Sequence, residues 1–121
     1  MRRRMMKSKI HRATVTGAEL DYAGSISLDT RLMELADIRE HEQVAVLAID
    51  NGARFETYAI AGSAGQVQLN GAAARLVEPG HKVIVITYAD YDDTELFPGW
   101  APTVVQVDGQ NRPRERTGLI G

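Results

Sequence analysis

The sequence predicts a mainly β fold, a compact β-barrel with one or two short helices. Apolar and β-branched residues recur in many short runs, several of which alternate with polar residues as half-buried strands do. Turn signals separate these runs, and only one segment has the spacing of an amphipathic helix. With 121 residues, 44% of them hydrophobic, the chain suits a single compact domain over residues 1–121.

The first half of the chain predicts three strands and the helix. The strands are expected over residues 8–16, 26–28 and 42–50, where β-branched residues are frequent. Between the second and third strands, Asp29 is suited to cap the amino end of a short helix that ends near Ile38. The apolar stripe of this helix predicts packing against the core.

A hairpin is predicted where Asn51 and Gly52 separate two apolar runs. A two-residue turn of type I′ fits this pair, because that turn needs positive φ at both central positions. The return strand is expected over residues 53–61. On strict alternation it has two faces, one with Arg54, Glu56, Tyr58 and Ile60 and the other with Phe55, Thr57 and Ala59.

The second half predicts further short strands over residues 66–69, 82–88 and 100–107. The nearly continuous apolar run at 82–88 predicts burial on both faces of that strand. Residues 70–74 form either a helical turn or a tight loop with small side chains. The polar residues 109–121 predict a mobile tail.

Positive charge gathers at the start of the chain. Residues 1–12 hold six of the 14 basic residues and no acid, so the remainder has eight bases against 16 acids. A basic arm of this kind could contact nucleic acid. A solvated terminus is the preferred interpretation, because no aromatic-rich or helix-turn-helix pattern follows the arm, and we expect no nucleic-acid partner.

Composition excludes several classes of site. There is no Cys, so disulfides, thiolate catalysis and Cys-ligated metals are absent. His11, His41 and His81 lie far apart without the spacing of metal ligands, and we expect no metal. No apolar run approaches the roughly 20 residues of a membrane span. No apolar segment follows the basic start as in a signal peptide, so we expect a cytoplasmic protein without a membrane partner.

A Gly24-Ser25 pair stands at the entrance to the strand expected at residues 26–28. A turn is the ordinary interpretation of such a pair. Because glycine lacks a Cβ, its carbonyl carbon is open to close approach. If the fold strains this peptide, the serine hydroxyl can attack that carbonyl and replace the amide by an ester. The residues therefore allow self-processing as well as an ordinary turn, and the rest of the sequence is needed to choose between the two.

Four motifs in the sequence bear on this choice. They are Lys9-Ile10-His11, Tyr22-Ala23-Gly24-Ser25, Arg54-Phe55-Glu56-Thr57-Tyr58 and Asn70-Gly71-Ala72-Ala73. In order and spacing, this set resembles the aspartate 1-decarboxylase family, pyruvoyl-dependent lyases that make β-alanine for pantothenate biosynthesis. The resemblance runs from about Lys7 to Tyr88, most of the chain.

The resemblance implies that the chain is a zymogen that cleaves itself between Gly24 and Ser25. Its products are a short β chain, residues 1–24, and an α chain, residues 25–121, that begins with a pyruvoyl group made from Ser25. That group forms a Schiff base with L-aspartate and accepts the electron pair left when carbon dioxide departs. No free cofactor or metal is implied. The implied fold is a double-psi β-barrel, and the implied assembly is a homotetramer with sites between neighbouring subunits.

Three residues of the motifs resemble the part of the site that handles substrate. Tyr58 is implied as the proton donor, a general acid. Arg54 presents a planar fork suited to one carboxylate of aspartate, and Lys9 can hold the other. The alternatives are that Tyr58 is a half-buried strand aromatic and that Arg54 and Lys9 are ordinary exposed charges.

Thr57 resembles the residue that stabilises the oxyanion during self-cleavage. Regular pleating puts Thr57 and Tyr58 on opposite faces, so either a bulge twists the strand or the two serve sites on different sides. His11 and Tyr22 resemble residues near the carboxylate that cleavage frees at Gly24. A surface histidine and a packing tyrosine are the alternatives.

The Asn70, Gly71, Ala72 and Ala73 run resembles a substrate-binding segment. It could present backbone amides and one side-chain amide to the substrate, and its small side chains leave room. A tight turn is the alternative. Leu47 departs from the family pattern, in which some members carry an aromatic there, and this leaves the pocket wall in doubt.

Several functional alternatives stay open beside aspartate decarboxylation. The same chemistry could act on glutamate, because pocket length cannot be read from the sequence. A barrel that binds nucleic acid or another partner through the basic arm is a second alternative, and an unprocessed inactive homologue is a third. The need for a maturation factor is unknown.

Overall fold

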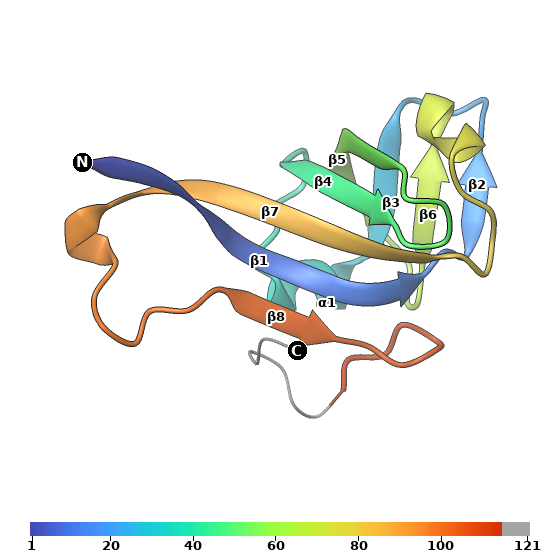
Figure 1. Ribbon diagram of the computed structural model, residues 1–121. Helices are drawn as coiled ribbons and strands as arrows, with labels where there is room; N and C mark the ends of the chain where they lie inside the picture. Colours follow the sequence, from blue (N-terminus) through green and yellow to red (C-terminus); the bar gives the residue numbers. More distant parts are fainter. Residues whose placement is uncertain (115–121) are drawn as a thin grey trace.

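A computed structural model describes residues 1–114 as a small barrel formed by one strongly curved sheet of eight strands (Figure 1). The strands are β1 (Arg2–Thr14), β2 (Gly17–Glu19), β3 (Ser25–Asp29), β4 (Gln43–Ala48), β5 (Arg54–Gly62), β6 (Val67–Asn70), β7 (Lys82–Asp92) and β8 (Thr103–Gln106). The helical segments are α1 (Thr30–Leu35) and two 3-10 turns, η1 (Gly71–Arg75) and η2 (Asp93–Glu95). The mainly β fold class is confirmed.

The order of strands across the sheet is β2-β6-β3-β5-β4-β7-β1-β8. The β1–β8, β2–β6 and β3–β5 pairs are parallel, and the remaining pairs are antiparallel. The connection from β1 to β2 joins the two halves of the sheet, because Thr16 N–H donates to the Val67 carbonyl at 2.8 Å. Val15 N–H donates likewise to the His81 carbonyl at 2.8 Å.

The core lies inside this curl and is built mainly of β-branched and leucine side chains. Its largest fully buried members are Ile10, Val15, Ile26, Leu28, Leu32, Val44, Val46, Val67, Leu69, Val83, Val85 and Val104. Each such side chain stabilises the fold by about 1.5–3 kcal/mol on burial. The expected two-sided burial of β7 is wrong. Val83 and Val85 are buried, but Ile84 and Ile86 are only half-buried on the outer face of the sheet.

The helix cap at Asp29 is confirmed. Its carboxylate accepts the Arg31 N–H at 2.8 Å and the Gly65 N–H at 2.8 Å, so it also ties the helix start to the turn before β6. Helix α1 ends earlier than expected. Asp37 takes a left-handed φ of 54°, which turns the chain so that Ile38 N–H bonds back to the Met33 carbonyl at 2.8 Å.

The hairpin at Asn51-Gly52 is confirmed, but the type I′ turn is wrong. Of the pair only Gly52 has positive φ, 74°, and its N–H donates to the Ala48 carbonyl at 2.8 Å across a longer loop. The Asn51 side chain accepts the Ala53 N–H at 2.9 Å and donates to the Leu76 carbonyl at 2.7 Å. These two bonds fix Asn51 in an ordinary conformation.

The basic start of the chain is exposed to solvent, as the preferred interpretation held, and it is also part of a strand. Strand β1 begins at Arg2, and with β7 it forms a two-stranded ribbon that projects from the barrel (Figure 1). Arg3 Nε pairs with Asp93 at 2.6 Å, and Arg4 Nε pairs with Asp90 at 3.2 Å. The acidic segment after residue 89 therefore offsets the basic arm across the ribbon.

The expected mobile tail is wrong for residues 109–114. Asn111 is fully buried at a left-handed φ of 63°, and its amide bonds to the Thr14 carbonyl at 2.8 Å and the Gly65 carbonyl at 3.0 Å. Thr14 N–H donates back to the Asn111 side chain at 2.7 Å. The rest of the expected tail, residues 115–121, lies outside the described residues. Within residues 1–114, no helix is both long and apolar enough to cross a membrane.

Candidate active site

Ser25 is the first residue of β3, the strand that lies between β5 and β6. Its Cα pairs in register with Asn70, the last residue of β6. All five residues of β3 are buried, and Ser25 itself is 1% exposed. Gly24, one residue earlier, is exposed. The Gly24–Ser25 peptide therefore marks the boundary between the surface and the core.

A chain of side-chain hydrogen bonds fixes the Ser25 hydroxyl. Ser25 Oγ donates to the Ala23 carbonyl at 2.9 Å and accepts from Asn70 Nδ2 at 3.0 Å. Asn70 Nδ2 also donates to Ser27 Oγ at 3.0 Å, while Gln68 Nε2 donates to Asn70 Oδ1 at 2.8 Å. With Gln68 Nε2 as donor, the Asn70 carbonyl oxygen faces Gln68 and the Asn70 amide nitrogen faces the two serines.

Gly71 packs directly on the backbone of Gly24. At a φ of 74°, a Cβ on residue 71 would lie 2.7 Å from Gly24 Cα and 3.1 Å from the Tyr22 carbonyl oxygen. No side chain fits at that separation, so only glycine allows η1 to begin here. Of the two structures predicted for residues 70–74, the helical turn is confirmed.

A cavity of about 410 Å³ opens beside this backbone. It is lined by Gly24, Phe55, Glu56, Thr57, Asn70, Ala72, Ala73, Arg75 and Leu76. The structure therefore brings together one group of the expected site residues, which we call the cleavage group: Gly24, Ser25, Thr57, Asn70, Gly71, Ala72 and Ala73. Small side chains at 72 and 73 leave the space open next to the peptide.

Strand β5 is regular where Thr57 and Tyr58 follow each other. Its register with β4 runs without a break from Gln43↔Tyr58 to Leu47↔Arg54. No bulge reorients the strand, so successive side chains point to opposite faces of the sheet. Of the two alternatives left by the sequence, the bulge is therefore wrong, and Thr57 and Tyr58 lie on different sides of the strand.

The remaining expected residues lie on the face opposite Thr57, the outer face, to which the register Ser27↔Ile60 also assigns the side chains of Ser25 and Ser27. We call Lys9, Arg54 and Tyr58 the outer group. Arg54 and Tyr58 alternate along β5, and Lys9 reaches the same face through the register Lys9↔Ile86 on β7 and Ala45↔Ile86 on β4. Arg54 has no ion pair or side-chain hydrogen bond within residues 1–114, so its guanidinium is available to a ligand.

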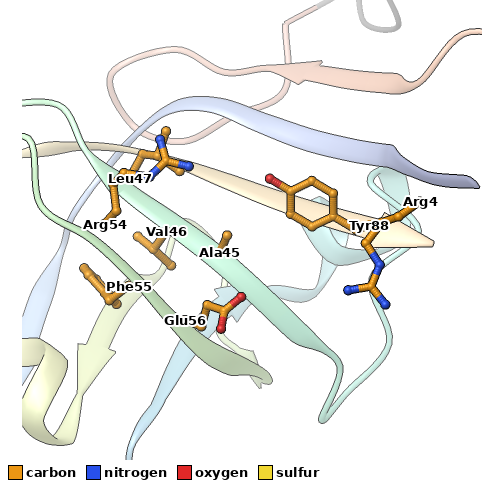
Figure 2. A pocket seen from close by; sticks show the side chains of 8 residues that line it. All are labelled: Arg4, Ala45, Val46, Leu47, Arg54, Phe55, Glu56 and Tyr88. Atoms are coloured by element: carbon orange, nitrogen blue, oxygen red, sulfur yellow. The ribbon is translucent and has the colours of Figure 1, made fainter. Parts of the chain in front are cut away.

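A second cavity, of about 450 Å³, lies on this outer face. Figure 2 shows Arg54 beside Leu47 at one end and Arg4 beside Tyr88 at the other, with Glu56 between them. Tyr58 is 37% exposed, and its ring centroid lies 6.2 Å from that of His41. The outer group and this cavity offer cationic and phenolic groups, but no part of the Ser25 backbone.

His11 and Tyr22 do not join the cleavage group within this chain. His11 lies in a third cavity, with Arg12 and Gln106. Burial, followed by the charges of Lys9 and Arg12, lowers the pKa of His11 below its ordinary 6.5. The Tyr22 side chain is 54% exposed, and only its backbone carbonyl approaches Gly71. A role for both beside the freed Gly24 carboxylate stays a prediction.

Sequence reasoning missed Ser27 and Gln68, which fix Asn70. The signal was available, because Ser25 and Ser27 alternate on one strand and Gln68 and Asn70 alternate on another. Residues two apart on a strand share a face, so adjacent strands with that pattern bring four polar side chains together. The pairing of those two strands was the missing information.

Comparison with known proteins places these motifs in one family. The model of the aspartate decarboxylase family matches residues 1–114. A protein of Kosmotoga olearia named aspartate 1-decarboxylase is 57% identical over 118 residues, 96% of this chain and 100% of that protein. Proteins of the same name from Heliobacterium modesticaldum and Thermoanaerobacter pseudethanolicus are 58% and 56% identical, each over 93% of this chain and over 86% and 97% of their own lengths.

Proposed function

The chain belongs to the aspartate decarboxylase family, and from that premise we propose separate roles for the cleavage group and the outer group. The reaction is the decarboxylation of L-aspartate to β-alanine and carbon dioxide, which supplies pantothenate biosynthesis. The cleavage group prepares the enzyme by autocatalytic cleavage, and the outer group binds and protonates the substrate. The cytoplasm is the proposed location, in keeping with a chain that contains no Cys.

The first step of the proposal is self-cleavage at Gly24-Ser25. Ser25 Oγ attacks the Gly24 carbonyl carbon, the C–N bond breaks, and an ester replaces the amide. Loss of the Ser25 α-proton then expels the Gly24 carboxylate and leaves a dehydroalanine. Its enamine tautomerises to an imine, and water releases ammonia to give the pyruvoyl ketone.

The single observation that supports this step best is the way Asn70 and Gly71 hold the two sides of the bond. Asn70 Nδ2 fixes the Ser25 hydroxyl at 3.0 Å, and Gly71 presses against Gly24 so closely that no side chain would fit. Nucleophile and target carbonyl therefore have little freedom to separate, which lowers the entropic part of the barrier. Thr57, in the cavity beside Gly24, is the proposed hydroxyl donor to the oxyanion.

The pyruvoyl group fits this position, because Ala72 and Ala73 leave space beside residue 25 for a substrate amine to approach. Once formed, the group supplies the electron sink for loss of carbon dioxide. The chain's own residues supply charge, orientation and a proton. Arg54 and Lys9 are proposed to bind the two carboxylates of aspartate, and Tyr58 to donate the proton that replaces carbon dioxide.

The separation of the outer group from the cavity beside Gly24 favours sites made by two copies of the chain. Within one chain, Lys9, Arg54 and Tyr58 are all absent from the lining of that cavity, whereas Thr57 is part of it. The outer face also carries half-buried Leu47, Ile84 and Ile86, apolar surface suited to cover by another copy. We therefore propose a homotetramer in which the outer group of one subunit completes the cleavage group of its neighbour.

The intact mass of the purified protein under denaturing conditions tests the proposal. Processing predicts two chains, residues 1–24 and 25–121, with the second lighter by one ammonia than the hydrolysis fragment. Ser25→Ala is expected to give one full-length species without decarboxylation. Turnover by Ser25→Ala would overturn the assignment, and a single full-length species in inactive wild-type protein would favour an unprocessed homologue.

A further inference from the structure

A third cavity, of about 350 Å³, lies at the end of the sheet formed by β1, β7 and β8. The residues that define its character are His11, Arg12, Lys82, Gln106, Asp108 and Arg114. It shares no lining residue with the cavity beside Gly24 or with the cavity around Arg54. No residue of the cleavage group or the outer group lines it, and His11 is the one lining residue for which the sequence predicts a role in the reaction.

The charge around this cavity is strongly positive. Arg12, Lys82 and Arg114 carry three permanent cations, and Asp108 is the one acid in the lining. The Asp108 carboxylate is already occupied. It accepts Arg112 Nε at 3.0 Å, and its other oxygen accepts the backbone N–H groups of Gln110 at 2.9 Å and Arg112 at 3.0 Å. These contacts lower the pKa of Asp108, and within residues 1–114 the cations of the cavity have no other acidic partner.

Arg12 reaches the cavity from an unusual backbone conformation. Its φ is 60°, in the left-handed region that residues other than glycine rarely adopt, and it sits where the β1–β7 register shifts between Ile10 and Ala13. Such a bulge reorients a side chain, and bulges are frequent beside functional sites. Within residues 1–114 the Arg12 side chain makes no ion pair and no hydrogen bond, so its guanidinium is available to a ligand.

His11 contributes a second unmatched group. Its Nδ1 is buried without a hydrogen-bond partner, the one side-chain atom of which this holds among the described residues. Buried polar atoms are almost always paired, so an orphan in a cavity wall indicates a partner that the chain does not supply. A neutral imidazole with its proton on Nδ1 can donate one hydrogen bond into the cavity.

Two of the cations are held in place by the fold. Lys82 Nζ donates to Thr14 Oγ1 at 2.5 Å, which leaves two of its three protons. Arg114 Nε donates to the Val107 carbonyl at 3.2 Å, which leaves its terminal nitrogens. The donors therefore come from β1, β7 and the segment after β8, three different directions. A tetrahedral oxyanion suits such an arrangement better than a planar carboxylate, which accepts from one plane.

We propose that this cavity is a binding site for a phosphate group, either inorganic phosphate or the terminal group of a small phosphorylated molecule. Its volume lies within the roughly 300–1,000 Å³ usual for small-molecule sites. Arg12, Lys82 and Arg114 neutralise the oxyanion, and His11 donates to one of its oxygens. The proposal stands apart from decarboxylation, because it uses no residue of the cleavage group or the outer group.

Histidine NMR of the full-length enzyme tests this site directly. Inorganic phosphate is titrated at constant ionic strength while the imidazole signals of His11, His41 and His81 are followed. The expected result is a saturable shift of His11 alone, absent with chloride or L-aspartate. No saturable His11 shift, or an equal one with chloride, would overturn the proposal and leave an adventitious ion only.

Matched variants separate binding from folding. Arg12→Asn keeps a residue that tolerates positive φ but removes the charge, and it should weaken phosphate binding roughly tenfold or more. Arg12→Lys should bind within a few-fold of wild type, and Arg31→Gln, which removes an exposed charge elsewhere, should change nothing. Unaltered affinity in Arg12→Asn, with its thermal unfolding also unaltered, would rule the site out.

Two further arms identify the ligand and isolate the site from the reaction. Tighter binding of glycerol 3-phosphate than of phosphate would indicate a phosphorylated molecule, and equal binding would indicate phosphate itself. Ser25→Ala, which is expected neither to cleave nor to turn over, should bind phosphate as wild type does. Phosphate binding by Ser25→Ala therefore tests the cavity independently of cleavage and decarboxylation.

Discussion

The cleavage group and the outer group differ in how completely one chain satisfies their polar atoms. In the cleavage group, Ser25 and Asn70 are buried, and their side-chain polar atoms are matched by hydrogen bonds of 2.8–3.0 Å. In the outer group, Arg54 makes no side-chain hydrogen bond within the described residues, and Tyr58 is 37% exposed. The hydrogen bonds around Ser25 are complete as folded, whereas the outer group offers side chains that still need a ligand.

This difference separates two stages of the proposed activity. Cleavage needs a fixed hydroxyl, a carbonyl held against it and an oxyanion donor, all of which one chain contains in the cleavage group. Turnover needs carboxylate-binding and proton-donating groups, which the same chain holds outside the cavity beside Gly24. Substitutions in the two groups should therefore fail at different stages, and the predictions below test that division.

The largest separation is expected for Tyr58→Phe. The ring and its packing remain, but the proton donor is lost, so kcat should fall by about 10²- to 10⁴-fold. Self-cleavage should proceed as in wild type, because Tyr58 is not among the residues that line the cavity beside Gly24. Denaturing mass and a steady-state assay on the same sample measure both. Normal turnover would show that Tyr58 is not the proton donor. Blocked cleavage would show that Tyr58 also takes part in self-cleavage, which would contradict the division of the two groups.

Thr57→Val should show the opposite pattern. Replacing the hydroxyl by a methyl group of similar size removes the proposed oxyanion donor, and self-cleavage should slow by about 10²- to 10³-fold. Thr57→Ser, which keeps the hydroxyl, should cleave much faster than Thr57→Val. The time course of the uncleaved fraction measures this. Equal rates for Val and Ser would show that the hydroxyl at position 57 is not the donor.

Arg54→Lys should affect binding more than chemistry. Lysine keeps the charge but loses the planar two-pronged contact with a carboxylate. The loss of one charged hydrogen bond, about 1.5–3 kcal/mol, should raise KM for L-aspartate by roughly 10- to 100-fold, with cleavage unchanged. Arg31→Gln serves as the control, because it removes an exposed arginine from helix α1. An unchanged KM in Arg54→Lys would place the substrate carboxylates elsewhere.

The smallest expected effect concerns stability in acid. The lowered pKa of His11 means that the unfolded chain takes up a proton near pH 6.5 while the folded chain resists it. The free energy of unfolding should therefore fall as the pH drops below 6.5, and His11→Asn should reduce that fall. Denaturant unfolding between pH 5 and pH 8 measures it, with His81→Asn as the control. A steeper acid loss in His11→Asn would contradict the sign.

Local chemistry explains what the sequence could predict. The Asp29 cap, the hairpin position, the helical turn after Asn70 and the alternation along β5 all depend on neighbours within a few residues. That alternation already placed Thr57 and Tyr58 on different faces, and the unbroken β4–β5 register excludes the bulge that would have joined them.

Long-range pairing explains what the sequence could not predict. Strand β1 extends to Arg2 because Asp90, Asp92 and Asp93 lie opposite its arginines, some 90 residues away in the chain. Asn111 is buried because Thr14 and Gly65 meet it there, although the sequence around it is polar. Each of these features needs a partner that only the folded chain brings near.

Co-expression of two defective chains tests most directly whether Ser25 and Tyr58 of different copies share a site. Ser25→Ala keeps Tyr58 but cannot form the pyruvoyl group, whereas Tyr58→Phe forms it but lacks the proton donor. In a randomly mixed oligomer, roughly a quarter of the sites should combine an intact Ser25 with an intact neighbouring Tyr58, and activity should return to about that fraction of wild type. Mixed oligomers with no activity beyond the two parents would contradict the account.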